Sequence, residues 1–250
     1  MKKEFLDKVD QYKDIYQNNT PFPHIRLENL FSTELMEDVV ENIYKNRDKK
    51  IWLNKMCTSG SDFSDLGKSV VKLTDYLVSD EWVHFLRDLT EIDDLYPDKT
   101  WFGAGVNFEP RGSHLEPHTD FNFRRSDSGG DWRRVNLLLF LSKDWKKEWG
   151  GQGELGHRNE VDEYVCDKKY NPDFNTAVIF STSDISYHSF DIVRCPEDKA
   201  RIVITSYYYS NDKGPHSSPR NVTHYIGWDK RRKQEEDYEQ RHGTGFKELE

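Results

Sequence analysis

The second part of the chain contains short apolar runs that alternate with turn-forming residues. Clusters of Gly, Asp, Asn and Pro separate four runs rich in β-branched and aromatic residues, at 101–108, 135–141, 177–180 and 202–209. Runs of this length and content favour strands. Several short strands with turn signals between them are typical of a β-sandwich or barrel. Residues 101–210 are therefore expected to form a β-core.

The first hundred residues have a different period. Apolar side chains recur at helical spacing in residues 3–17, and Ser32 can cap a second helix that presents one apolar face. A third helix is expected to begin at Asp80. Residues 1–100 are thus predicted to be mostly helical support for the core, and residues 211–250, which lack a clear period, to be a tail or lid. No linker separates these parts, so we expect a single α+β domain over residues 1–250.

Composition excludes several classes of protein. The chain has 36 Lys and Arg against 45 Asp and Glu, a formal net charge of −9, which argues against general affinity for nucleic acid. No apolar run approaches the roughly 20 residues of a membrane helix, and the N-terminal lysines precede no apolar segment of a secretory signal. Three scattered cysteines form no disulfide framework. A reducing, cytoplasmic setting is expected.

A possible metal site begins with His118-Thr119-Asp120. Residues two apart in a strand point to the same face, so His118 and Asp120 can reach one ion. His188, which follows the run at 177–180, is the best candidate for a third ligand. Two His and one carboxylate on one face of a metal form the arrangement of non-haem Fe(II) oxygenases. Arg201 opens an apolar run, and a buried guanidinium there suits a carboxylate such as the distal one of 2-oxoglutarate.

On these residues, the chain resembles the Fe(II)/2-oxoglutarate-dependent dioxygenases, in the prolyl 4-hydroxylase-like branch. Residues 135–145, running into residues 149–155, are similar to the strand, tryptophan and Gly-Gly-x-x-x-Leu pattern of that branch. The resemblance implies a double-stranded β-helix (jelly-roll) core with helices that buttress one sheet. It implies that Fe(II), 2-oxoglutarate and O2 take part, and that 2-oxoglutarate becomes succinate and CO2 while a C–H bond is hydroxylated. Halogenating relatives lack the carboxylate ligand, so Asp120 favours hydroxylation.

The same resemblance gives Arg201 the role of anchoring the far end of 2-oxoglutarate. The serine expected two residues after the arginine is absent, because position 203 is Val. No motif fixes the residue that holds the other carboxylate end. Asn107, Asn136 and Thr205 are the candidates for this contact.

Four arginines bracket the glycine-rich loop at residues 126–130: Arg124, Arg125, Arg133 and Arg134. They suggest a basic rim that attracts an anionic substrate, such as an amino acid or a carboxylated metabolite. The competing interpretation is a solvated loop whose charges have no function.

Several alternatives stay open at this point. His114 is a rival metal ligand, although it precedes the strand signal. The chain could be a peptidyl prolyl hydroxylase, a cupin-like metal protein without oxygenase activity, or a binding module that has lost catalysis. Arg201 favours an oxygenase over a cupin-like metal protein of another kind, which needs no carboxylate anchor. The intact His118, Asp120 and His188 speak against a binding module that has lost catalysis. We expect a small-molecule substrate and no membrane partner. The oligomeric state is left open, with a homodimer among the options.

Overall fold

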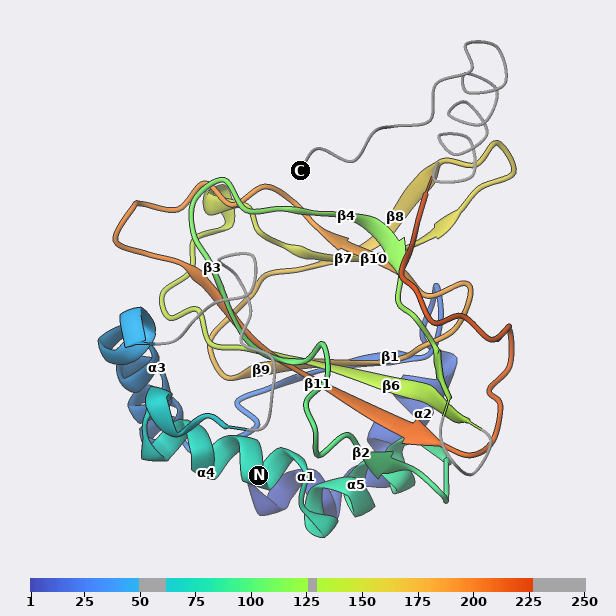
Figure 1. Cartoon of the computed structure of the whole chain (residues 1–250), viewed down its shortest axis with the longest axis horizontal. Helices are drawn as coiled ribbons and strands as arrows, with labels where there is room; N and C mark the ends of the chain where they lie inside the picture. The colour runs from blue at the N-terminus through green and yellow to red at the C-terminus, as the bar shows by residue number, and fades with distance from the viewer. Residues whose placement is uncertain (50–61, 126–129, 227–250) are drawn as a thin grey trace, which may run out of the picture.

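The computed structural model describes residues 1–49, 62–125 and 130–226. A layer of helices lies beneath one of two facing antiparallel sheets (Figure 1). The helices are α1 (Lys3–Asp7), α2 (Val9–Asn18), α3 (Thr33–Asn46), α4 (Lys68–Leu77) and α5 (Asp80–Thr90), with 3₁₀ turns η1 (Arg47–Lys49), η2 (Ser64–Leu66) and η3 (Lys147–Trp149).

Serine side chains cap the two longest helices. The Ser32 hydroxyl accepts a hydrogen bond from the backbone N–H of Leu35, and Ser79 caps α5 through the N–H of Trp82, each at 3.4 Å. The predicted cap at Ser32 and the helix beginning at Asp80 are thus confirmed. The helix expected over residues 3–17 is divided at Lys8, which lies between α1 and α2.

Helix α4 was not among the expected elements. Its buried residues, Val70, Leu73, Thr74 and Leu77, recur at helical spacing, so the signal was present in the sequence. The glycine-rich loop at residues 126–130 falls mainly outside the described residues.

The larger sheet has seven strands in the order β1-β9-β6-β11-β2, with β3 paired to β11 and β5 paired to β6. The smaller sheet has five strands in the order β12-β4-β10-β7-β8. The strands are β1 (His24–Glu28), β2 (Tyr96–Pro97), β3 (Gly105–Glu109), β4 (Leu115–Thr119), β5 (Phe123–Arg124), β6 (Asp131–Phe140), β7 (Gly153–Arg158), β8 (Tyr164–Tyr170), β9 (Thr176–Ser181), β10 (Tyr187–Phe190), β11 (Arg201–Ser210) and β12 (His224–Tyr225).

Strand alternation separates two cores. In β6, Val135, Leu137 and Leu139 belong to the main hydrophobic cluster, which includes the buried faces of the helices. The alternate residue Phe140 belongs to a smaller cluster with Val178, Phe180 and Val203. Since neighbouring residues of a strand point to opposite faces, the first set packs on the helices and the second faces the other sheet.

One expectation needs correction. The run at 101–108 begins as a strand only at Gly105, because Trp101 has a positive φ of 55° and the N–H of Ala104 bonds back to its carbonyl, which makes a turn. After residue 210, β12 pairs with β4. Residues 227–250 lie outside the described part of the chain, so a tail or lid there stays a prediction. No helix among the described residues has the length and apolar character to cross a membrane.

Candidate metal centre

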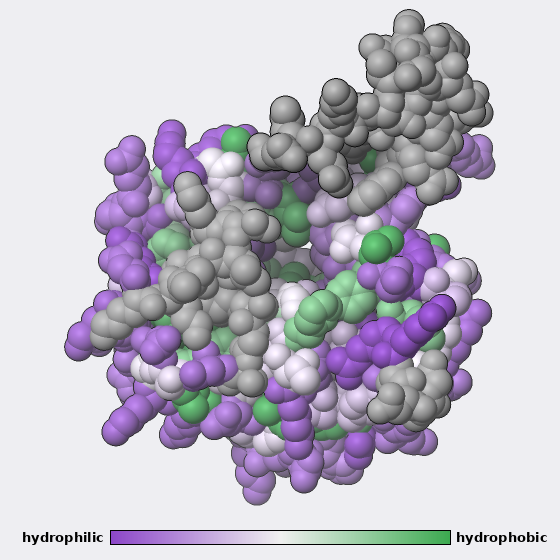
Figure 2. Space-filling view, in the orientation of Figure 1, coloured by the Kyte–Doolittle hydropathy of each residue, from purple (hydrophilic) through white to green (hydrophobic). Residues whose placement is uncertain are grey.

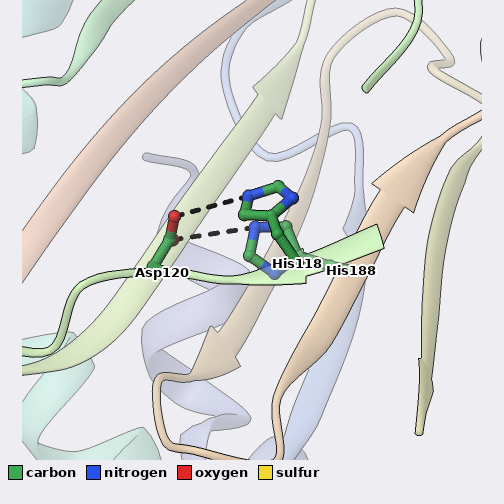
Figure 3. A group of neighbouring side chains, drawn as sticks. All are labelled: His118, Asp120 and His188. Atoms are coloured by element: carbon green, nitrogen blue, oxygen red, sulfur yellow. Dashed lines mark ion pairs between the residues drawn. The ribbon is translucent and has the colours of Figure 1, made fainter. Parts of the chain in front are cut away.

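Three buried side chains from two neighbouring strands converge between the sheets. His118 is in β4, Asp120 follows it, and His188 is in β10, directly opposite His118 in the antiparallel pairing. Their potential ligand atoms lie within 4.8 Å of one another. His118 Nε2 is 3.5 Å from Asp120 Oδ1, and His188 Nε2 is 3.6 Å from Asp120 Oδ2 (Figure 3).

The backbone orients both imidazole rings in the same way. His118 Nδ1 lies 2.8 Å from the carbonyl oxygen of Glu116, and His188 Nδ1 lies 3.1 Å from that of Ser186. A carbonyl can only accept, so each Nδ1 carries the proton and each Nε2 presents its lone pair toward Asp120. Partners of this kind on the second nitrogen are typical of metal-bound histidines.

Burial and neighbouring charges hold Asp120 and His188 in the protonation states that a metal requires. Burial alone would raise the pKa of Asp120, but Arg133 and the two histidines hold it well below its usual range. Burial and the neighbouring His118 lower the pKa of His188 to about 4. At neutral pH the site therefore presents a carboxylate and a neutral imidazole at His188, as metal ligation needs.

One oxygen of Asp120 has both a hydrogen bond and an ion pair. Asn136 Nδ2 donates to Asp120 Oδ2 at 2.9 Å, and Arg133 Nη1 lies 2.9 Å from the same oxygen. The Arg133 side chain is sandwiched between the rings of Phe121 and Tyr207, with its guanidinium carbon 3.7 and 3.8 Å from their centroids. These contacts fix the carboxylate and leave Oδ1 toward His118.

The residues present fit Fe(II). Ligands in adjacent positions around a metal with bonds of roughly 2.1 Å lie roughly 3 Å apart, close to the observed separations. Two imidazoles and one carboxylate on one side are the donor set of non-haem iron. No other cluster of three His, Cys, Asp or Glu side chains in the described part of the chain has this geometry.

A cavity of about 140 Å³ lies beside the three ligands and is lined by both sheets. In the orientation of Figure 2, the molecule is hollowed between the two sheets. Arg201, Asn107, Asn136 and Thr205, predicted from the sequence as cosubstrate contacts, all line this cavity. The buried Oδ1 atom of Asn136 accepts no hydrogen bond within the described chain, so a polar acceptor is available to a ligand there.

Arg201 is buried, as the sequence predicted, but it already has a carboxylate partner. Its Nη1 donates to Glu109 Oε2, and its Nε donates to the carbonyl of Gly151 at 2.7 Å. Glu109 is directly opposite Arg201 in the β3–β11 pairing. It was missed in the sequence, although it stands two residues after Asn107 in the same strand and therefore shares its face.

The four arginines do not form one rim. Arg124 pairs with Asp131 at 2.9 Å and Asp98 at 3.3 Å, Arg125 is exposed, and Arg134 lines a separate cavity. Only Arg133 of the four reaches the metal ligands.

His114, the rival candidate for a metal ligand, is exposed and stands outside the ligand cluster. Its Nε2 lies 3.7 Å from the Glu116 carboxylate. The ring of Tyr225 in β12 packs on that of His118, with centroids 5.3 Å apart. No periodic pattern in the sequence marks β12, which is only two residues long.

Residues 104–209 match the family model of the 2OG-Fe(II) oxygenase superfamily. This match, together with the His–Asp–His centre, confirms the predicted class: the chain is a dioxygenase that uses Fe(II), 2-oxoglutarate and O2. No curated protein shows a significant sequence match to it.

Several solved structures are similar to this one. A prolyl hydroxylase from Trichoplax adhaerens, in complex with a hypoxia inducible factor peptide fragment, has a TM-score of 0.58 at 17% identity, covering 84% of this chain and 94% of that one. A prolyl 4-hydroxylase from Phytophthora capsici has a TM-score of 0.59 at 15% identity, covering 84% and 67%. The non-heme alpha-ketoglutarate-dependent epimerase SnoN, from nogalamycin biosynthesis, has a TM-score of 0.52 at 10% identity, covering 87% and 94%. At these identities the similarity establishes a shared fold.

Proposed function

We propose that this chain hydroxylates an unactivated C–H bond of a small, anionic or amino-acid-like substrate, while 2-oxoglutarate is decarboxylated to succinate. The observation that carries the proposal is the buried His118–Asp120–His188 centre beside a cavity that contains Arg201. In this proposal the three residues hold Fe(II). Arg201 anchors the distal carboxylate of 2-oxoglutarate, with Asn107, Asn136 and Thr205 as further contacts.

When bound, the iron and its cosubstrate supply the oxidative chemistry. The chain's own residues bind and orient the iron and the cosubstrate, and they exclude water from the site. The Nε2 lone pairs of His118 and His188 are aimed by backbone carbonyls, and Asn136 fixes the Asp120 carboxylate. Phe180 packs on His188, with ring centroids 4.9 Å apart, and closes the apolar side of the centre.

Charge beside the centre supports the substrate class. Arg133 contacts Asp120, and Arg220 donates to the Thr119 hydroxyl at 2.9 Å. Arg220 and His224 also line a groove of about 500 Å³ that includes Tyr187, the neighbour of His188. Asp184 lines the same groove and pairs with Arg220 at 2.9 Å, so in this proposal a carboxylate or another anion of the substrate shares that guanidinium with Asp184.

The first experiment tests the centre itself. Anaerobic addition of Fe(II) and 2-oxoglutarate to the protein should give a visible charge-transfer band. The His118→Ala variant should lose this band, whereas His114→Ala, an exposed histidine on the same segment, should keep it. A wild-type protein that binds neither ion nor cosubstrate would overturn the proposal.

The second experiment identifies the substrate. Succinate release is measured with O2, 2-oxoglutarate and individual amino acids, carboxylated metabolites or phosphorylated metabolites. The similar solved structures include prolyl hydroxylases, so proline-containing peptides form the second arm. Acceleration by peptides alone would replace the small-molecule substrate with a peptidyl one.

The proposal also covers the fold, the domain organisation and the location of the protein. The two facing antiparallel sheets form a double-stranded β-helix, and residues 1–250 form one domain. Its location is proposed to be cytoplasmic; Cys166 and Cys195 are both free thiols, which suits a reducing compartment.

A further inference from the structure

The guanidinium that should anchor 2-oxoglutarate is neutralised by a residue of the chain itself. Arg201 and Glu109 are both buried, with side chains 3% and 7% exposed, and they form an ion pair across β11 and β3. Both residues line the cavity that also contains the metal ligands. The pair is therefore part of the site into which the cosubstrate is proposed to bind.

Binding of 2-oxoglutarate creates a conflict of charge at this position. Its distal carboxylate would meet a guanidinium that already carries the Glu109 carboxylate. The ion pair is neutral, so a second carboxylate adds one uncompensated negative charge. An unpaired buried charge is costly, and such groups commonly neutralise by taking up a proton.

Within residues 1–49, 62–125 and 130–226, no second positive charge acts on Glu109. The guanidinium carbon lies 4.2 Å from the ring centroid of Phe190 in β10 and 5.1 Å from that of Phe140 in β6. Gly151 contributes a carbonyl, which is a further acceptor. Among the described residues, Arg201 is the charged group whose field acts on Glu109.

Glu109 is suited to hold a proton at this place. Burial raises the pKa of Glu109 above its usual value, and Arg201 opposes this rise. If a second carboxylate takes over the guanidinium, the opposing influence weakens and the balance moves further toward the acid. The β3–β11 register keeps Glu109 opposite Arg201, so the side chain stays in the cavity in either form.

We propose that Glu109 takes up one proton from solvent when the distal carboxylate of 2-oxoglutarate binds Arg201, and that the resulting carboxylic acid remains beside the cosubstrate as a hydrogen-bond donor. The step adds H⁺ to one carboxylate oxygen and involves no oxidation. This inference rests on the proposed function. It makes Glu109 a determinant of cosubstrate affinity and of its pH dependence.

The sign of the pH effect follows from linkage. Protons are taken up on binding, so affinity falls as pH rises above the pKa that Glu109 has in the cosubstrate-free protein. For one proton, the Kd of 2-oxoglutarate rises about tenfold per pH unit in that range. Both carboxylates of 2-oxoglutarate are ionised throughout, so the cosubstrate itself does not produce this slope.

Anaerobic titration calorimetry tests the proposal directly on the wild-type protein loaded with Fe(II). 2-Oxoglutarate is titrated at one pH in buffers of different ionisation enthalpy, and the dependence of the observed enthalpy on the buffer gives the number of protons taken up. The titrations are repeated between pH 6.5 and pH 8.5. We expect an uptake approaching one proton at the upper end and a Kd that rises with pH.

Two variants assign the proton to a residue. Glu109→Gln keeps the shape and one acceptor oxygen but cannot ionise, and should bind 2-oxoglutarate at least tenfold more tightly at pH 8.5, with no uptake and a flat Kd. Glu160→Gln removes the same charge from an exposed position between β7 and β8, and should behave as the wild type.

Each outcome has one meaning. Binding of 2-oxoglutarate without proton uptake by the wild type overturns the role of Glu109 and leaves the proposed function intact. Uptake that persists in Glu109→Gln assigns the proton elsewhere and also overturns it. Absence of both binding and the charge-transfer band contradicts the proposed function itself. The wild-type measurement stands even if the Glu109→Gln variant fails to fold.

Discussion

Single residues beyond the three ligands determine how the centre holds a metal. Asn136 donates to Asp120 Oδ2 at 2.9 Å, in a buried position on β6. Asn136→Ala removes this donor and frees the carboxylate to rotate. We expect the affinity for Fe(II) alone to fall about 10- to 100-fold, the usual effect of losing a partner of a metal ligand. Anaerobic calorimetry without cosubstrate measures it, with the exposed Asn211→Ala as control.

A second prediction concerns Arg201, whose substitution should affect the binding of 2-oxoglutarate separately from the binding of Fe(II). Arg201→Ala should weaken 2-oxoglutarate binding about 10- to 100-fold, as expected for hydrogen bonds to a charged group, with little change in Fe(II) affinity. Arg201→Lys keeps the charge but not the planar guanidinium. Its affinity for 2-oxoglutarate should lie between those of the wild type and of Arg201→Ala. The charge-transfer band, titrated with either component, gives both affinities. Equal losses of both would contradict the assigned role.

At the scale of elements, β1 fastens the N-terminal half to the large sheet. His24 of β1 is fully buried, pairs with Phe180 of β9, and bonds through Nδ1 and Nε2 to the Phe22 carbonyl and the Tyr170 hydroxyl. Burial lowers the pKa of His24 below 6.5, with the Phe22 hydrogen bond opposing and Lys168 adding to the shift. The unfolded chain therefore binds this proton more readily than the folded one.

The sign of the stability change follows from that difference. The free energy of unfolding should fall as pH drops below about 6.5, the pKa of an unperturbed histidine. His24→Gln should lose less stability than the wild type between pH 7.5 and pH 5.5, because one buried site no longer takes up a proton on unfolding. Urea unfolding at both pH values measures this. His84→Gln, an exposed position on α5, is the control, and an equal loss in the two variants would contradict the role of His24.

Some residues of the site and of the helices could be placed from local sequence patterns alone. His118 and Asp120 needed only the two-residue period of a strand, and Ser32 only the preference of helix caps. Arg133 could not be placed in this way. In the β6–β11 ladder, Val135 pairs with Tyr208 and Arg133 with Tyr209, so Arg134 is an extra residue. Such a bulge turns the chain over locally, and Arg133 joins Asn136 on the face that holds Asp120.

Pairing between distant strands set the other limit of prediction. His188 was chosen as a ligand from its place after a strand, but its position opposite His118 depends on the β4–β10 ladder. The Arg201–Glu109 pair depends in the same way on β3 and β11. An apolar run in the sequence shows that a strand is buried. It does not show which carboxylate on another strand will lie opposite it.

For the whole molecule, the helical layer and the sheet share one hydrophobic cluster. Trp82 of α5 is fully buried in it, and its indole N–H donates to the Tyr208 hydroxyl in β11 at 2.7 Å, while that hydroxyl donates to the carbonyl of Leu77 in α4. Tyr208 neighbours Tyr207, which lines the cavity of the metal centre. A shared core of this kind predicts that helices and centre are lost together.

Trp82→Ala should lower the free energy of unfolding by about 3–5 kcal/mol, the cost of truncating a buried aromatic residue. Trp82→Phe keeps a ring in the core and loses mainly the hydrogen bond, at about 1 kcal/mol. In both variants and in the wild type, anaerobic denaturant titrations followed by far-ultraviolet circular dichroism and by the charge-transfer band should give coincident transitions. If the band disappeared before the helical signal, the helices and the metal-bearing sheets would be separate folding units, because a core shared by both cannot dissolve on one side alone.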